Sequence, residues 1–117
     1  MAVFVPITIE TGHGVDAILI YDDPLIHVSW ELSAKKNSKK LILFSTAEEF
    51  IRAASAFSKN VFVYVDVNLA NGVRGEDVAK KLSLLGFYNI YLATGFDPVN
   101  FTNIPFIKGV VDKHSPF

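Results

Sequence analysis

Side chains with carboxylate, hydroxyl and amine groups follow apolar segments of this chain at the places where strands are expected to end. Asp22 and Asp23 come directly after the run Ala-Ile-Leu-Ile-Tyr, and Asp66 comes directly after Val-Phe-Val-Tyr-Val. Thr94 follows Asn-Ile-Tyr-Leu-Ala, and Lys113 lies two residues beyond Gly-Val-Val. The carboxyl ends of parallel strands share one edge of a sheet, and open α/β sheets bind ligands there. We therefore expect these side chains to lie close together.

The chemistry that such a group of side chains supports is phosphoryl transfer with a divalent cation. Carboxylates that lie together raise one another's pKa unless a cation lies among them, and hard oxygen ligands suit Mg²⁺. Asp66 would be the nucleophile, as carboxylates are in aspartyl-phosphate enzymes. The Lys113 ammonium would neutralise phosphoryl oxygens, and the Thr94 hydroxyl would donate a hydrogen bond to one of them. The sequence thus predicts Mg²⁺ near Asp22, Asp23 and Asp66.

Each of these residues also has an ordinary structural interpretation. Asp66 alone would be the first acid of a loop, Thr94 a hydroxyl that caps a turn, and Lys113 a surface lysine. Asp23 before Pro24 has the form of a helix N-cap followed by proline at the first helical position. Their joint placement after consecutive strands is much less common by chance than any one of them, and this favours the functional interpretation.

Strand-like and helix-like patterns alternate along the chain with short connections between them. Consecutive strands should then be parallel and joined by right-handed crossovers, with helices on both faces of the sheet. This is the pattern of a doubly wound α/β domain. Pro105 limits any fourth helix, which would begin near Asp97, to one or two turns. We expect strands at 17–21, 41–44, 61–65, 89–93 and 108–111, and helices at 24–36, 46–57 and 76–85.

The first predicted helix carries a wide apolar face, and such a face requires burial against the sheet. We therefore expect both of its adjacent stripes to be covered. The stripes are Leu25, Val28 and Leu32, and next to them Ile26, Trp30 and Ala34.

The length of the chain predicts one domain, residues 16–117, preceded by a short segment. Residues 1–15 alternate weakly between apolar and polar and then reach a glycine-rich stretch, which is typical of turns. This segment is expected to be an edge strand, an extended arm or the end of a preceding domain.

The composition limits the function classes. The formal net charge is −1, so no strong field favours nucleic acid or a membrane surface. The chain has no Cys, which excludes disulfides and thiolate metal sites. No apolar run approaches the ~20 residues that span a bilayer, and the amino end lacks the pattern of a signal peptide. We expect a cytoplasmic domain.

Taken together, these segments resemble the receiver domain of two-component response regulators, over about residues 17–117. The resemblance implies a five-stranded sheet of order 2-1-3-4-5. The segments that carry it are Ile-Leu-Ile-Tyr-Asp22-Asp23, Val-Tyr-Val-Asp66-Val-Asn68-Leu69 with Gly75 downstream, Leu-Ala-Thr94-Gly95, and Gly109-Val-Val-Asp-Lys113 followed by Pro116-Phe117.

The resemblance implies roles for the residues of the site. Asp66 would accept a phosphoryl group from a phosphohistidine on a histidine kinase or a histidine phosphotransfer domain. Mg²⁺ would be bound by Asp23, Asp66 and the backbone carbonyl of Asn68, with Asp22 acting mainly through water. Thr94 would then move toward the phosphoryl group, so that phosphorylation shifts the population of two conformations.

The resemblance also implies a setting. Receivers often dimerise or bind targets through the surface near strands four and five, so a homodimer is one expected assembly. The arrangement also resembles the last module of a hybrid sensor histidine kinase, whose parent protein can be membrane-anchored. An isolated domain of this kind phosphorylates itself and is not expected to be an enzyme in the usual sense.

Three features depart from the family pattern. The position in the last strand where many receivers carry a switching aromatic residue is Val110 here, so the usual relay from the threonine to an aromatic is not expected. His114 and Ser115 separate Lys113 from Pro116, so the loop after the last strand differs from the usual Lys-Pro-Phe. The chain also ends where a fifth helix would begin, which would leave an apolar sheet face open at a cost of about 25 cal/mol per Å². We expect residues 1–15 or residues 101–106 to cover that face.

Three other functions are weighed against the phosphoacceptor. A phosphatase of the haloacid-dehalogenase type requires a second acid two residues after the nucleophile, where this chain has Asn68, which cannot act as a general acid. A flavodoxin-like nucleotide binder requires a neutral or positive phosphate loop, whereas Asp22 and Asp23 would repel phosphate. The serious alternative is a receiver-shaped interaction module that does not depend on phosphorylation.

Overall fold

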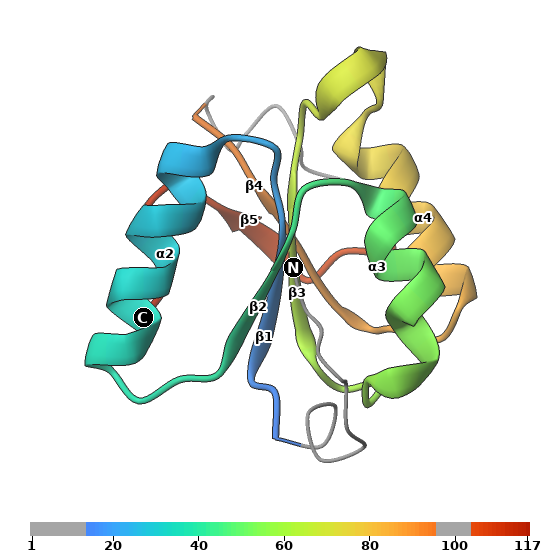
Figure 1. Ribbon diagram of the computed structural model, residues 1–117. Helices are drawn as coiled ribbons and strands as arrows, with labels where there is room; N and C mark the ends of the chain where they lie inside the picture. Colours follow the sequence, from blue (N-terminus) through green and yellow to red (C-terminus); the bar gives the residue numbers. More distant parts are fainter. Residues whose placement is uncertain (1–13, 96–103) are drawn as a thin grey trace.

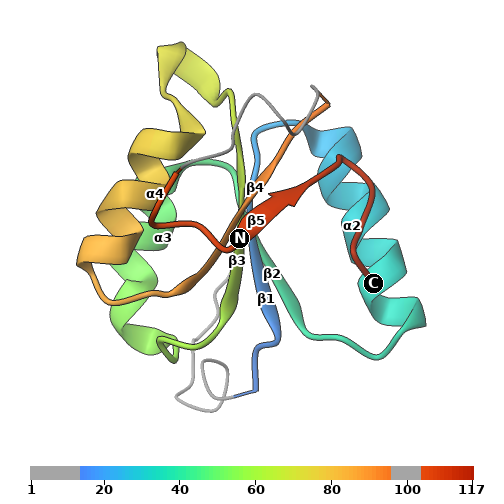
Figure 2. The same cartoon turned by 180° about the vertical axis from the view of Figure 1, so that it is seen from behind.

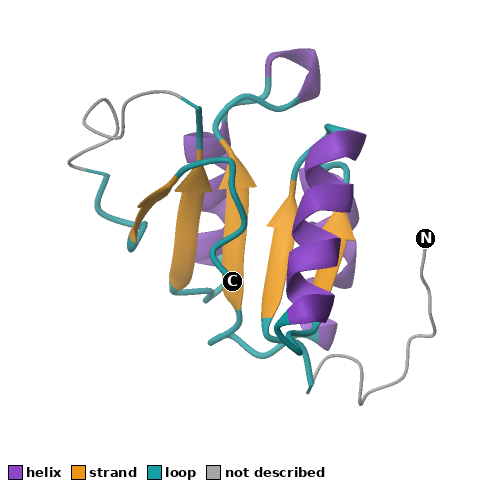
Figure 3. Ribbon diagram, turned by 90° about the vertical axis from the view of Figure 1, so that its left-hand side faces the viewer, coloured by secondary structure: helices purple, strands orange, loops and turns teal. Residues whose placement is uncertain are grey.

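A parallel sheet of five strands forms the centre of the domain, in the order β2-β1-β3-β4-β5 (Figure 1). The structure is a computed structural model that describes residues 14–95 and 104–117. All five strands point the same way, so their carboxyl ends lie along one edge (Figure 3). The predicted fold and strand order are confirmed. The strands are β1 (Ala17–Ile20), β2 (Leu41–Phe44), β3 (Phe62–Asp66), β4 (Asn89–Ala93) and β5 (Gly109–Val111).

Helices cover both faces of the sheet, as expected for a doubly wound domain. The α2 helix (Pro24–Lys36) lies on one face, and α3 (Ala47–Ala53) and α4 (Gly75–Leu84) lie on the other (Figures 1 and 2). Short 3₁₀ turns at Ala54–Ala56 and Ala70–Gly72 follow α3 and β3. Within residues 14–95 and 104–117, no helix combines the length and the apolar character that a membrane span requires.

The helix ends follow from local sequence. The Asp23 carboxylate accepts a hydrogen bond from the backbone N–H of Leu25, and proline occupies the first turn of α2. At α3, Thr46 and Glu49 form the reciprocal hydrogen bonds of a capping box. After α4 the chain turns at Gly86 with φ of 102°, a left-handed conformation that favours glycine.

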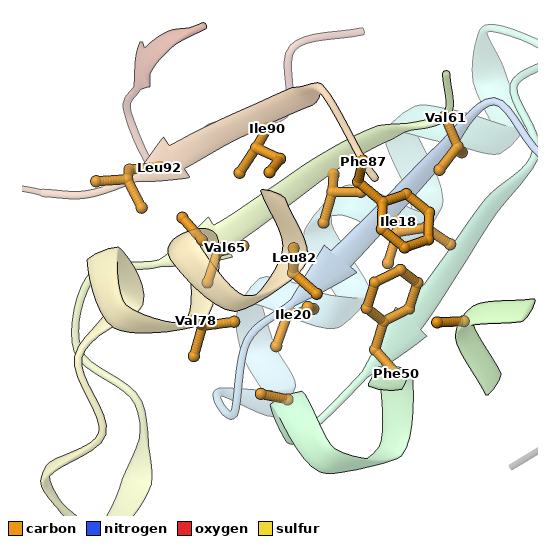
Figure 4. Packing of buried hydrophobic residues seen from close by; sticks show 14 of the residues in the cluster. Ile18, Ile20, Phe50, Val61, Val65, Val78, Leu82, Phe87, Ile90 and Leu92 are labelled. Carbon is orange, nitrogen blue, oxygen red and sulfur yellow. The ribbon is translucent and has the colours of Figure 1, made fainter. Parts of the chain in front are cut away.

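The larger part of the core lies between the sheet and the helices α3 and α4. The rings of Phe50 and Phe87 lie 5.3 Å apart between their centroids, next to Ile18 of β1 (Figure 4). Phe50 also packs against Phe44 and Phe57, so four aromatic rings form one group within this layer. The β-branched residues of the strands fill the remainder, which explains why the strands read as nearly continuous apolar runs.

A smaller apolar cluster lies between the sheet and α2. The indole of Trp30 packs edge-on against Tyr64 at 5.3 Å, and Tyr64 stacks on Tyr91 at 5.3 Å. The ring of Phe117 packs on the other side of Trp30 at 6.3 Å. Trp30 is therefore the centre of the α2 side of the domain.

The prediction that both apolar stripes of α2 are buried is wrong for one of them. Leu25, Val28 and Leu32 are 77%, 53% and 64% exposed, whereas Trp30 and Ala34 are buried. The reason is that Trp30 is large enough to fill the space between helix and sheet, and nothing in residues 14–95 and 104–117 forms a second layer outside α2. This exposed side is called the α2 apolar stripe below.

The carboxyl end of the chain covers part of the sheet face on the α2 side. Phe117 packs against Trp30, and the chain end lies beside α2 in both views (Figures 1 and 2). Ile104 and Phe106 pack on the opposite side, against the α3 and α4 cluster. Residues 1–13 and 96–103 lie outside the described residues. They include most of the two segments expected to cover the sheet face, and the start of the fourth helix expected from Asp97.

The contrast between the two sides of α2 predicts two different costs of truncation. Trp30→Ala should lower the free energy of unfolding by about 3 to 5 kcal/mol, because it empties a fully buried site. Leu32→Ala on the same helix should change it by no more than about 0.5 kcal/mol. Urea unfolding followed by circular dichroism measures both values. A large cost for Leu32→Ala would show that the α2 apolar stripe is covered in solution.

Candidate functional site

Asp66 is the last residue of β3 and one of the two buried polar residues of the described chain, with 6% of its surface exposed. It pairs with Ala93 of β4, and its position places its side chain on the α2 side of the sheet. The backbone N–H of Asn68 donates a hydrogen bond of 3.1 Å to one carboxylate oxygen of Asp66. The turn after β3 therefore holds the carboxylate in one orientation.

Gly75 allows α4 to begin directly against the end of β3. Its N–H donates a 2.9 Å hydrogen bond to the carbonyl of Val67. A Cβ at this position would lie 2.2 Å from the carbonyl oxygen of Asp66 and 2.8 Å from the Cα of Val67. Only glycine permits this approach, so the start of α4 and the Asp66 turn are positioned together.

Lys113 approaches the site from the loop after β5. Its side chain lies along Gly95, where a Cβ would be 3.2 Å from the lysine Cε. The indole N–H of Trp30 donates a 2.8 Å hydrogen bond to the carbonyl of Lys113. This hydrogen bond ties the loop after β5 to α2. The positive charge of Lys113 acts to lower the pKa of Asp66.

Thr94 follows β4 and is almost completely buried, with 1% of its surface exposed. Its N–H donates a hydrogen bond to the carbonyl of Val111, which extends the pairing of β4 with β5. Thr94 is next to Ala93, the β4 partner of Asp66, and Lys113 follows β5, so both residues lie at the same edge of the sheet as Asp66.

Asp22 and Asp23 have different environments. The Asp23 carboxylate caps α2 through its 2.9 Å hydrogen bond to the N–H of Leu25. Asp22 is exposed, and its charge raises the pKa of Asp66. The turn between them and β1 is held by a hydrogen bond between the His27 ring and the carbonyl of Tyr21. The charge of Asp22 therefore acts on Asp66, whereas one carboxylate oxygen of Asp23 is engaged at the start of α2.

The environment of Asp66 raises its pKa to about 6. Burial is the largest cause, because it disfavours the charged form. The hydrogen bond from Asn68 opposes this effect, the negative charge of Asp22 adds to it, and the positive charge of Lys113 opposes it. The carboxylate is thus mostly ionised at neutral pH but retains basicity.

The residues present fit a hydrated cation rather than a site built from protein ligands alone. Within the two described ranges, no three His, Asp or Glu side chains come together closely enough to hold a metal. Mg²⁺ commonly keeps several waters and binds through one or two carboxylates. The carboxylates of Asp22 and Asp66, with the backbone carbonyl of Asn68, are the residues that would hold it.

Three positions that serve this site were not predicted as such from the sequence. Trp30 and Gly75 act through packing and hydrogen bonding of the backbone. Tyr21 is the last residue of the apolar run before Asp22 and Asp23, and it is buried. Its ring nevertheless carries a hydroxyl group. A sequence signal existed for Gly75, which follows the Asp66 turn, but none distinguishes Trp30 or Tyr21 from ordinary core aromatics.

The fold and the site together define a class, an α/β domain of flavodoxin-like arrangement with an acid, an amine and a hydroxyl at the carboxyl edge of its sheet. A scan against protein-family models finds no match, and a search of curated proteins finds no significantly similar sequence.

The raised pKa of Asp66 predicts that stability falls as pH rises. The folded protein holds this proton more tightly than the unfolded chain, so stability is lost as pH rises from about 4 to about 6 and stays lower above it. Asp66→Asn should therefore increase the free energy of unfolding by about 2 to 3 kcal/mol at pH 7 in the absence of divalent cations. The gain should largely disappear at about pH 4.

Urea unfolding at both pH values measures this difference. Asp77→Asn is the matched control, because Asp77 is an exposed acid in the first turn of α4. Equal stability of Asp66→Asn and the unaltered protein at pH 7 would mean that the Asp66 carboxylate is well solvated.

Proposed function

We propose that this domain is a phosphoacceptor that takes a phosphoryl group onto Asp66, in the manner of the receiver domains that it resembles. The observation that carries the proposal is the environment of Asp66. A buried carboxylate is oriented by the N–H of Asn68 at 3.1 Å and lies within the field of the Lys113 ammonium. Thr94, the residue after β4, lies at the same edge of the sheet.

The proposed step is an in-line transfer to the carboxylate. An oxygen of Asp66 forms a bond to phosphorus while the bond from phosphorus to the donor atom breaks, and the bonding electrons remain with the donor. With a phosphohistidine donor this atom is an imidazole nitrogen, which takes up a proton as it leaves. Lys113 stabilises the charge on the phosphoryl oxygens, and burial excludes water from the acyl phosphate.

When it is bound, Mg²⁺ would neutralise negative charge on the phosphoryl oxygens in addition to Lys113. Asp22, Asp66 and the carbonyl of Asn68 would hold it together with water. This differs from the arrangement that the family resemblance implies, because Asp23 is engaged as the cap of α2. A bound cation would also lower the pKa of Asp66, since it favours the ionised carboxylate.

The setting that we propose is a two-component phosphorelay, with a histidine kinase or a histidine phosphotransfer domain as donor and the cytoplasm as the location. The chain would be a module of a hybrid sensor histidine kinase. Phosphorylation adds charge beside Thr94 and Lys113, and both residues are joined to β5 or its loop. A shift in the population of β4–β5 arrangements would carry the signal.

One observation favours the alternative, an interaction module that does not take phosphate. Among the described residues, Asp22 is the one carboxylate whose charge raises the pKa of Asp66, so the negative charge available to bind a cation is small. The α2 apolar stripe would in that case serve a protein partner without any phosphorylation at the sheet edge.

The proposal predicts a gain of one phosphoryl mass. Incubation with Mg²⁺ and acetyl phosphate should label the protein, and intact-mass spectrometry should detect the gain. Asp66→Asn should abolish the label, because it removes the nucleophile. Lys113→Ala should reduce the rate of labelling by at least about tenfold, because it removes a charge that stabilises the transition state.

Asp77→Asn is the control for loss of a carboxylate elsewhere and should be labelled like the unaltered protein. If the unaltered protein gains no mass under conditions that label a known receiver, the domain is not a phosphoacceptor and the interaction module is favoured. Labelling that persists in Asp66→Asn would place the acceptor at another residue.

The different environments of the two acids predict different effects of neutralising them. Asp22→Asn should raise the Mg²⁺ concentration needed for half-maximal labelling by about tenfold, because it removes a proposed ligand. Asp23→Asn should leave this concentration nearly unchanged, because asparagine is also a good helix N-cap. Titration of Mg²⁺ at fixed acetyl phosphate measures both. The reverse result would assign the cation to Asp23.

A further inference from the structure

The hydroxyl of Tyr21 is buried without a hydrogen-bond partner among the described residues. The residue itself is 2% exposed, so water does not satisfy the group from outside. Buried polar side chains are nearly always hydrogen-bonded, and an exception requires a reason. Phenylalanine would fill the same space without an unpaired hydroxyl, so packing alone does not explain a tyrosine here.

Tyr21 lies beside Asp66 at the carboxyl edge of the sheet. The last residue pair of β1 and β3 is Ile20 with Val65, so the next residues along the two strands, Tyr21 and Asp66, are neighbours. The N–H of Tyr21 donates a 3.0 Å hydrogen bond to the carbonyl of Phe44, which continues the ladder of β1 with β2. The backbone of Tyr21 is therefore still part of the sheet.

The two side chains share one face. Successive side chains of a strand alternate between faces, and Tyr21 belongs to the α2-side cluster together with Leu19 and Tyr64. Asp66 follows Tyr64 by two residues, so it projects to the same side. The phenol ring and the Asp66 carboxylate therefore stand side by side on adjacent strands.

The electrostatic surroundings agree with this placement. Burial raises the pKa of Tyr21, and the negative charges of Asp66, Asp23 and Asp22 raise it further, in that order. The hydroxyl is accordingly neutral and protonated at physiological pH. It can donate one hydrogen bond and accept others.

We propose that the Tyr21 hydroxyl is a binding group of the Asp66 site that hydrogen-bonds an oxygen atom of the ligand bound there. This oxygen belongs either to a water of the Mg²⁺ hydration shell or to the phosphoryl group on Asp66. The inference rests on the proposed function. It assigns a neutral phenol, rather than a third carboxylate, to the side of the site formed by β1.

The role of Tyr21 also accounts for the small number of acids at the site. A phenol contributes hydrogen bonds without a negative charge, so it adds no repulsion to the carboxylates of Asp22 and Asp66. The site would then bind a cation more weakly than three carboxylates do, and would be less repulsive to an incoming phosphoryl donor.

Binding of Mg²⁺ alone is the first test. The backbone N–H of Asn68 bonds to Asp66, so its NMR shift reports binding at the carboxylate. Tyr21→Phe should weaken Mg²⁺ binding by about threefold to tenfold if the partner is a water of the cation. Tyr64→Phe is the matched control, since it removes a hydroxyl from a buried tyrosine on the same face, and its Mg²⁺ affinity should be unchanged.

Labelling by acetyl phosphate at saturating Mg²⁺ is the second test. If the partner is a phosphoryl oxygen, Tyr21→Phe should bind Mg²⁺ normally but be labelled more slowly, or lose its label sooner, by about threefold to tenfold. Tyr64→Phe should behave like the unaltered protein in this arm also.

The outcomes separate this inference from the proposed function. If the unaltered protein is labelled and Tyr21→Phe matches it in both tests, the role of Tyr21 is overturned and the phosphoacceptor stands. If the unaltered protein neither binds Mg²⁺ nor takes a label, both fail. A strong loss of stability in Tyr21→Phe, measured by thermal unfolding, would reveal a structural partner for the hydroxyl and would also overturn the inference.

Discussion

The burial of one carboxylate at the end of the central strand is the constraint around which this edge of the domain is built. Asp66 is held in its orientation by the turn that follows it, and that turn exists because Gly75 lets α4 begin against the strand. Burial makes the charge costly, and it makes any opposite charge nearby effective. The charge of Lys113 would therefore act strongly on Asp66. The same holds for the charges of a bound cation and of an attached phosphoryl group, because water screens them little there.

Much of the fold was predictable because the local signals agree with one another. Apolar runs bounded by polar loops mark β1 and β3, and Thr46 with Glu49 marks the start of α3. The strand order follows from alternation and from the family resemblance rather than from any single residue. The buried side of α2 was not predictable in detail, because periodicity identifies two apolar stripes and only the packing of Trp30 selects between them.

The candidate site was predictable as a set of residues but not as an arrangement. The positions of Asp22, Asp66, Thr94 and Lys113 follow from strand ends, which sequence patterns locate to within one residue. The cap of α2 was predictable because Asp23 precedes Pro24, but the sequence pattern does not show how strongly each of the two acids acts on Asp66. The unpaired hydroxyl of Tyr21 is a property of three-dimensional packing that no spacing reveals.

The hydrogen bond from Trp30 to the Lys113 carbonyl joins residues that lie far apart in the sequence. Closing so long a loop costs conformational entropy, which the contacts at its ends must offset. The acidic half of the site, at β1 and β3, uses strands that pair with each other directly. The counter-charge of the carboxylates therefore depends on the docking of the carboxyl end of the chain against α2, so a change that loosens this end would also weaken the electrostatic balance at the sheet edge.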